Sequence, residues 1–112
     1  MKKKIWTGTI TGTNIGNVFL ILEHEGNDVS GSLTINDINF GVADYIVHGK
    51  LNNEKVKLLG TPTNSSTMAS IVNNIAYGSI TIEGKVSGQE IKGIWESSIG
   101  TKGVFSIEEQ VI

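Results

Sequence analysis

The sequence contains no cysteine, which excludes a disulfide, a thiolate metal site and a cysteine nucleophile. A chain without thiols fits a reducing compartment, and we expect this protein in the cytoplasm. The longest uninterrupted apolar run covers only Val18–Leu22, far short of the roughly 20 residues that a membrane-spanning helix needs. No membrane span is therefore predicted.

Arginine is also absent, so all nine basic residues are lysines, and they are spread along a chain of formal net charge −2. Arginine supplies the planar fork that recognises phosphates and base edges through paired hydrogen bonds. Its absence, together with the mild acidity of the chain, argues against nucleic-acid binding.

The usual signatures of catalysis are missing as well. His24 and His48 stand alone, with no H-x-H, H-E-x-x-H or cysteine–histidine cluster to hold a metal ion. No serine lies in a G-x-S-x-G context, and no glycine motif joins a strand to a helix as in nucleotide-binding loops. Asp37 and Asp44 could pair as acid and base, but nothing in the sequence orients them. We expect no enzymatic activity, no cofactor and no metal.

The pattern that is present is an alternation of apolar and polar residues with a period of two, which is typical of β-strands with one buried face. It recurs from end to end, at about residues 4–12, 17–24, 29–35, 42–51, 56–60, 77–86, 91–95 and 102–109. Glycine falls on the predicted inner face of nearly every strand, at Gly8, Gly31, Gly49, Gly60, Gly84, Gly93 and Gly103. Small residues beside large ones suit the narrow interior of a closed barrel.

An internal repeat supports the prediction that the strands close into a barrel. Residues Val47–Leu51 match Ile82–Val86 at a shift of 35, and each copy is predicted to form one hairpin, the first with its turn at Asn52-Asn53. A hairpin cannot bury its face alone, so repeated hairpins imply a meander that closes on itself. We predict an all-β fold, with residues 1–112 forming one closed up-and-down antiparallel barrel of about eight strands. The alternative is a two-sheet β-sandwich.

One stretch departs from the β pattern. Within residues 65–76, apolar side chains recur at helical spacing, at Met68, Ile71, Val72 and Ile75. This segment is predicted to be either a short amphipathic helix or a long loop.

Because antiparallel strands alternate in direction, the connections sort into two ends. The short turns, 25–28, 52–53 and 87–89, share one end, and the longer connections, 13–17, 36–42, 61–75 and 98–101, share the other. Longer connections carry function more often. We therefore expect a small apolar or amphipathic ligand at the long-loop end, bound by Tyr45, Trp95, Phe40 and Met68. Trp6 is expected to plug the opposite end.

The outer face offers a second hypothesis. Six apolar residues take the outward parity: Phe19, Ile21, Ile46, Leu59, Ile94 and Val104. A turn centred on Asn52-Asn53 would place Ile46 directly opposite Leu59, where the two bury each other only partly. A second copy of the chain would complete that burial. The alternative function is therefore a structural or interaction module that forms a homo-oligomer, expected as a dimer, through Ile46, Leu59 and Ile94.

Three features of the layout are an opening Trp6-Thr7-Gly8, short turns at one end and Gly93-Ile94-Trp95 near the close. In these features the chain resembles the avidin- and lipocalin-type barrels, a calycin-like architecture. It is also similar to the compact barrel sensor domains of bacterial antiphage effectors that bind cyclic nucleotides, and the abundance of isoleucine, asparagine and lysine is typical of a bacterial genome rich in AT. The resemblance covers the whole chain as architecture and implies a small-molecule ligand, but it assigns no ligand residue by position.

Overall fold

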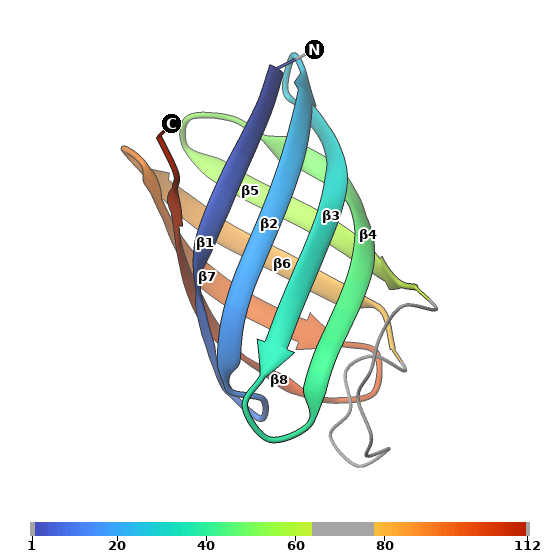
Figure 1. Cartoon of the computed structure of the whole chain (residues 1–112). Coiled ribbons are helices and arrows are strands. Elements are labelled where there is room, and N and C mark those ends of the chain that lie inside the picture. The colour runs from blue at the N-terminus through green and yellow to red at the C-terminus, as the bar shows by residue number, and fades with distance from the viewer. Residues whose placement is uncertain (1, 64–77, 112) are drawn as a thin grey trace.

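The computed structural model describes residues 2–63 and 78–111, which form an antiparallel β-barrel (Figure 1). In chain order the strands are β1 (Lys2–Gly12), β2 (Gly16–Glu25), β3 (Asp28–Asp37), β4 (Gly41–Leu51), β5 (Lys55–Pro62), β6 (Ile80–Ser87), β7 (Glu90–Ser97) and β8 (Lys102–Glu109). Each strand pairs with the next, and β8 pairs with β1, which closes the barrel. The predicted eight-stranded up-and-down barrel is confirmed, and the two-sheet sandwich is wrong.

The seam between β1 and β8 runs from Trp6 opposite Glu109 to Gly12 opposite Gly103. The N-terminal lysines pair with β2, because β1 begins at Lys2 rather than near Lys4. Every described strand has a neighbour on both sides, so none of them offers an open edge to another chain. A partner that meets the described barrel must therefore contact side chains on its outer face or residues at its ends.

Inward side chains fill the barrel, as the alternation predicts. Five large residues from different strands are each at most 2% exposed: Trp6, Leu33, Tyr45, Leu58 and Trp95. The buried cluster continues through the other inward valines, leucines and isoleucines, and it includes residues from all eight strands. The predicted inner face of the strands is thus confirmed.

Most of the inward glycines are explained by close contact between strands rather than by a crowded interior. A Cβ atom would lie only 1.8–2.0 Å from a carbonyl oxygen of the adjacent strand at Gly8, Gly31, Gly49, Gly93 and Gly103. Such a distance leaves no room for any side chain. Gly60 does fit the prediction of a narrow barrel interior, since a Cβ atom there would lie 2.7 Å from the side chain of Ile80.

The β4–β5 hairpin differs from the prediction in its register. Leu51 pairs with Val56, which centres the turn on residues 53 and 54 instead of 52 and 53. The cause is the Asn52 side chain, whose Oδ1 accepts hydrogen bonds from the backbone N–H groups of Glu54 (2.8 Å) and Lys55 (2.9 Å). Asparagine therefore shapes this turn through its side chain, as in an Asx-turn, and the turn shifts by one residue.

This shift moves the outer-face partners by two residues. Ile46 lies opposite Thr61, and Leu59 lies opposite His48. The prediction that Ile46 and Leu59 are directly opposed is therefore wrong, and the two are diagonal neighbours.

The internal repeat has a structural counterpart. Val47 pairs with Gly60 in the β4–β5 hairpin, and Ile82 pairs with Trp95 in the β6–β7 hairpin. Both partners are shifted by 35 residues, so the two hairpins have the same register as well as similar sequences.

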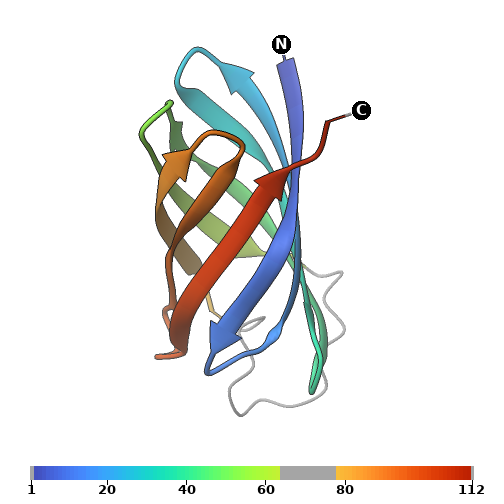
Figure 2. The same cartoon turned by 90° about the vertical axis from the view of Figure 1, so that its left-hand side faces the viewer.

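The two ends of the barrel are arranged as expected. The two described chain ends lie at the same end as the turns that link β2 to β3, β4 to β5 and β6 to β7 (Figures 1 and 2). We call this the short-turn end. The turns 13–15, 38–40 and 98–101 lie at the long-loop end, where β5 ends and β6 begins. The segment 65–76, predicted as a helix or loop, lies outside the described residues.

Candidate functional site

The structure places three of the four predicted ligand-binding residues, and Met68 lies outside the described residues. Tyr45 on β4 and Trp95 on β7 point into the barrel and are each 1% exposed. Phe40 lies in the β3–β4 turn and packs against the buried cluster. Trp95 lines the cavity inside the barrel, whereas Tyr45 and Phe40 do not. This one cavity therefore does not bring the three described residues together.

That cavity has a volume of only about 10 Å³, and every residue that lines it is apolar. A single water molecule needs about 10–15 Å³ of such space, and a typical small-molecule site measures about 300 Å³ or more. The described barrel interior is therefore filled by its own side chains.

Trp95 has a structural role that sequence reasoning did not identify. Its indole N–H donates a hydrogen bond to the backbone carbonyl of Thr11 at 3.1 Å, which links β7 to β1 across β8. The partner of Trp95 on β8 is Gly103, which has no side chain that would separate the indole from the Thr11 carbonyl. The indole thus braces the barrel near the long-loop end.

The Tyr45 hydroxyl and the Trp6 indole N–H are buried and lack a hydrogen-bond partner among the described residues. Burial raises the pKa of the Tyr45 hydroxyl, because water cannot reach the phenolate form. Trp6 lies beside a shallow pocket of about 330 Å³, which is also lined by residues of the short turns. Its position agrees with the expectation that it closes this end.

Asp37 is held in place by structural contacts. Its carboxylate is buried and accepts hydrogen bonds from Asn14 Nδ2 (2.7 Å) and from the backbone N–H groups of Asn39 (2.8 Å) and Phe40 (3.1 Å). Asp44 instead accepts a hydrogen bond from Thr34 Oγ1 at 2.7 Å. Asp37 therefore organises the β3–β4 turn and fastens it to Asn14, which sequence reasoning missed because the two are 23 residues apart.

Residues 2–63 and 78–111 contain neither a candidate metal site nor a candidate membrane-spanning helix. No group of three or more histidine, cysteine, aspartate or glutamate residues there could hold a metal ion. The same part of the chain has no helix with the length and apolar character needed to cross a membrane.

The outer face carries exposed apolar side chains, as the strand parity predicts. Ile46, Leu59 and Ile94 are 60%, 43% and 57% exposed. Phe19 and Val104 are exposed too, whereas Ile21 is half-buried. These residues do not form one patch, because Ile94 lies on β7, three strands away from Ile46 on β4.

The directly opposed apolar pair that was expected on β4 and β5 occurs elsewhere. Ile94 on β7 pairs with Val104 on β8, and Val104 is 55% exposed. Sequence reasoning named both residues as outward but could not pair them, since that required the register between β7 and β8.

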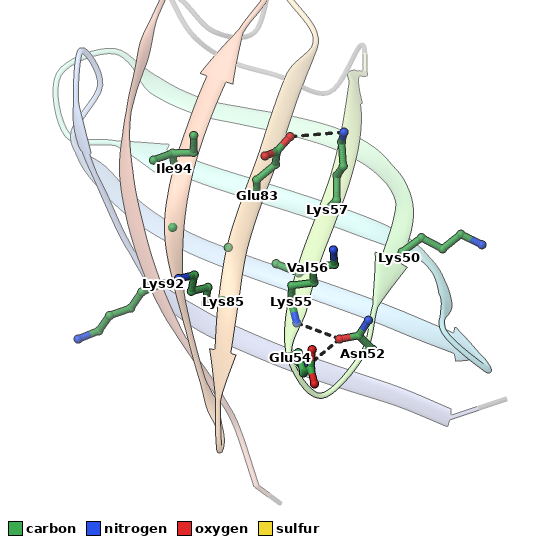
Figure 3. A pocket seen from close by; sticks show the side chains of 12 residues that line it. Lys50, Asn52, Glu54, Lys55, Val56, Lys57, Glu83, Lys85, Lys92 and Ile94 are labelled. Atoms are coloured by element: carbon green, nitrogen blue, oxygen red, sulfur yellow. Dashed lines mark hydrogen bonds and ion pairs between the residues drawn. The ribbon is translucent and has the colours of Figure 1, made fainter.

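An open groove of about 840 Å³ lies on the outer face of β4–β7, toward the short-turn end (Figure 3). We call it the lysine groove; its lining residues are Lys50, Asn52, Glu54, Lys55, Val56, Lys57, Glu83, Gly84, Lys85, Lys92, Gly93 and Ile94. Five of the nine lysines line it, beside two glutamates, which gives a formal charge of +3 on a chain of net charge −2. Sequence reasoning missed the groove, because these lysines are spread along the chain.

The comparisons with known proteins do not assign this chain to a family. No protein-family model matches the sequence, and no curated protein matches it. The architecture itself is compatible with a calycin-like small barrel, since it is a closed antiparallel meander of eight strands.

Proposed function

We propose that this protein is a non-enzymatic interaction module that works through the outer face of its barrel and associates with a second copy of itself. The observation that carries the proposal is the filled interior, with a cavity of about 10 Å³. A barrel whose core is occupied by its own side chains, and whose described strands are all paired, leaves its outer surface for recognition.

The contact that we propose centres on Ile94 and Val104. They are direct partners across β7 and β8, and both remain more than half exposed within the single chain. Exposed apolar pairs are stabilised when a second surface removes them from water. A two-fold dimer is the commonest arrangement, and in it each copy presents the same pair to the other.

Sedimentation velocity and light scattering on the full chain test this proposal. The protein should be a dimer at high micromolar concentration, and Val104→Lys should be a folded monomer, because the interface would bury an unpaired ammonium group. Phe19→Lys is the matched control, since Phe19 is an exposed apolar residue on β2, which β1 separates from β8.

Two results would count against the contact. A monomeric unmodified protein would remove self-association altogether. A dimer that survives Val104→Lys but dissociates in the double variant Ile46→Lys, Leu59→Glu would move the interface to β4 and β5.

A second candidate is small-molecule binding at the long-loop end, and the Tyr45 hydroxyl favours it. This hydroxyl is buried without a partner among the described residues, and a ligand atom could supply one. The resemblance to avidin- and lipocalin-type barrels and to effector sensor domains supports the same candidate. A thermal-shift screen against metabolites tests it, because a ligand of the native state raises the melting temperature. A hit should lose its effect in Tyr45→Phe and keep it in Val104→Lys.

A further inference from the structure

The lysine groove contains directly opposed like charges on adjacent strands. Lys85 on β6 pairs with Lys55 on β5 and with Lys92 on β7. Neighbouring strands lie about 4.8 Å apart, so these three lysines form a row about 10 Å long across the barrel surface. Like charges at directly opposed positions repel and destabilise a sheet. We call Lys55, Lys85 and Lys92 the lysine row.

The charges of this row are only partly neutralised. Lys92 forms an ion pair with Glu90 at 3.0 Å, but neither Lys55 nor Lys85 has an ion-pair partner among the described residues. Close by, Lys57 pairs with Glu83 at 3.5 Å, so this glutamate is already engaged. In Figure 3 the side chains of Lys50 and Lys92 stand at the two margins of the groove, with Lys55 and Lys85 between them. The row therefore presents positive charge to solvent.

The internal repeat produces the same feature twice. A shift of 35 residues relates Lys50 to Lys85 and Lys57 to Lys92. Lys50 is the direct partner of Lys57 in the first hairpin, and Lys85 is the direct partner of Lys92 in the second. Each hairpin thus carries an opposed lysine pair on its outer face, and the pairing of β5 with β6 brings the two hairpins together to form the groove.

We propose that the lysine groove is a binding site for a small molecule that carries two or more phosphate groups. Each phosphate carries up to two negative charges and several acceptor oxygens, so it can bridge adjacent ammonium groups and remove their repulsion. The row has room for two or three phosphates. A volume of about 840 Å³ lies within the range of small-molecule sites. The backbone of the directly paired Gly84 and Gly93 lines the groove beside the row and suits an uncharged part of the ligand.

The negative groups of the groove define where the phosphates bind. Glu83 lies opposite Lys57 on one side and Ile94 on the other, one step along the strands from the lysine row. Glu54 lines the groove at the β4–β5 turn. The phosphates therefore belong over Lys55, Lys85 and Lys92, where no carboxylate is a direct cross-strand partner.

Isothermal titration calorimetry with inorganic tripolyphosphate at physiological salt tests the proposal. The unmodified protein should bind with one-to-one stoichiometry, and the double variant Lys55→Gln, Lys85→Gln should bind at least about tenfold more weakly, equivalent to about 1.4 kcal/mol. The matched control is Lys3→Gln with Lys4→Gln, which removes the same charge from β1, outside the groove. These controls should bind as the unmodified protein does.

Three results would overturn the proposal. Equal weakening in the groove variant and the β1 control would mean that tripolyphosphate responds only to overall charge. Absence of binding by the unmodified protein would remove the site. Tighter binding of a duplex oligonucleotide or an acidic peptide, lost in the groove variant, would assign the groove to a macromolecule instead.

A second measurement guards against misfolding and separates this proposal from self-association. The groove variant should melt at the same temperature as the unmodified protein or slightly above it, because a repulsive contact is removed. The groove variant should keep the oligomeric state of the unmodified protein, so loss of the anion site and loss of the dimer are distinguishable.

Discussion

The close approach of neighbouring strands predicts that even a methyl group at Gly49 will damage the fold. A Cβ atom on Gly49 would lie 2.0 Å from the carbonyl oxygen of Lys57 and 3.0 Å from the Cα of Leu58. Both atoms belong to the backbone of β5, which is held in the barrel by hydrogen bonds on each side. The neighbour cannot turn away as a flexible side chain could, so the strands must separate locally.

The expected cost follows from this geometry. Overpacking a well-packed interior costs about 1–3 kcal/mol, and a collision with backbone belongs at the upper end. Gly49→Ala should therefore destabilise the barrel by about 3 kcal/mol, which lowers the melting temperature of a domain of this size by about 10–15 °C. Gly84→Ala should cost less, because its Cβ would come no closer than 2.8 Å to Lys92 O and to the ring of Phe105.

Thermal and urea unfolding, followed by circular dichroism, measure this effect. Ser30→Ala is the control, since Ser30 is an exposed outward residue on β3 and its replacement should change stability by less than about 0.5 kcal/mol. The reasoning is refuted if Gly49→Ala unfolds together with Ser30→Ala. If Gly84→Ala is instead more destabilising than Gly49→Ala, limited space inside the barrel is the main reason for these glycines.

The remaining predictions concern two buried polar side chains. Tyr45→Phe should stabilise the protein by about 1 kcal/mol, because it removes a buried hydroxyl that lacks a described partner; a loss of stability in urea unfolding would reveal a partner. Because burial raises the pKa of Tyr45, the unfolded chain ionises first, and stability should fall as the pH rises above the ordinary value of 10.0. Comparing urea midpoints below and above that pH tests this, and Tyr45→Phe should weaken the decline. Asp37→Ala leaves the N–H donors of Asn14, Asn39 and Phe40 without this acceptor, and it should cost about 3 kcal/mol or more in urea unfolding.

Much of the barrel could be predicted from the sequence because its causes are local. Alternation with a period of two fixes which side chains point inward, and the 35-residue repeat indicates hairpins that need each other to bury a face. Trp6, Tyr45 and Trp95 were placed inside on this reasoning, and each is buried. The sorting of short and long connections to opposite ends required only the alternating direction of the strands.

The register of pairing could not be predicted in the same way. The β4–β5 turn depends on which atoms the Asn52 side chain contacts, and its Oδ1 accepts from Glu54 and Lys55. A change of one residue in the turn alters every cross-strand partner. That is why Ile46 was matched to Leu59, although its partner is Thr61, and why the Ile94–Val104 pair was not recognised.

The repeated positions fall into two groups: inward residues that are part of the packed core, and outward residues that are not. At some inward positions the repeat preserves apolar character, as in Val47 with Ile82, and packing in the core accounts for this match, whereas Gly60 corresponds to Trp95. The outward lysines have no such explanation, since they are exposed and stand opposite other lysines. A sheet that needed only solubility would gain more from charges of opposite sign at these positions, because such pairs attract across the strands. In the first hairpin Lys50 and Lys57 form ion pairs with Asp28 and Glu83, and in the second hairpin Lys92 pairs with Glu90. Repulsion without a compensating carboxylate among the described residues therefore remains between Lys55 and Lys85, and this is what we expect of a surface that binds anions.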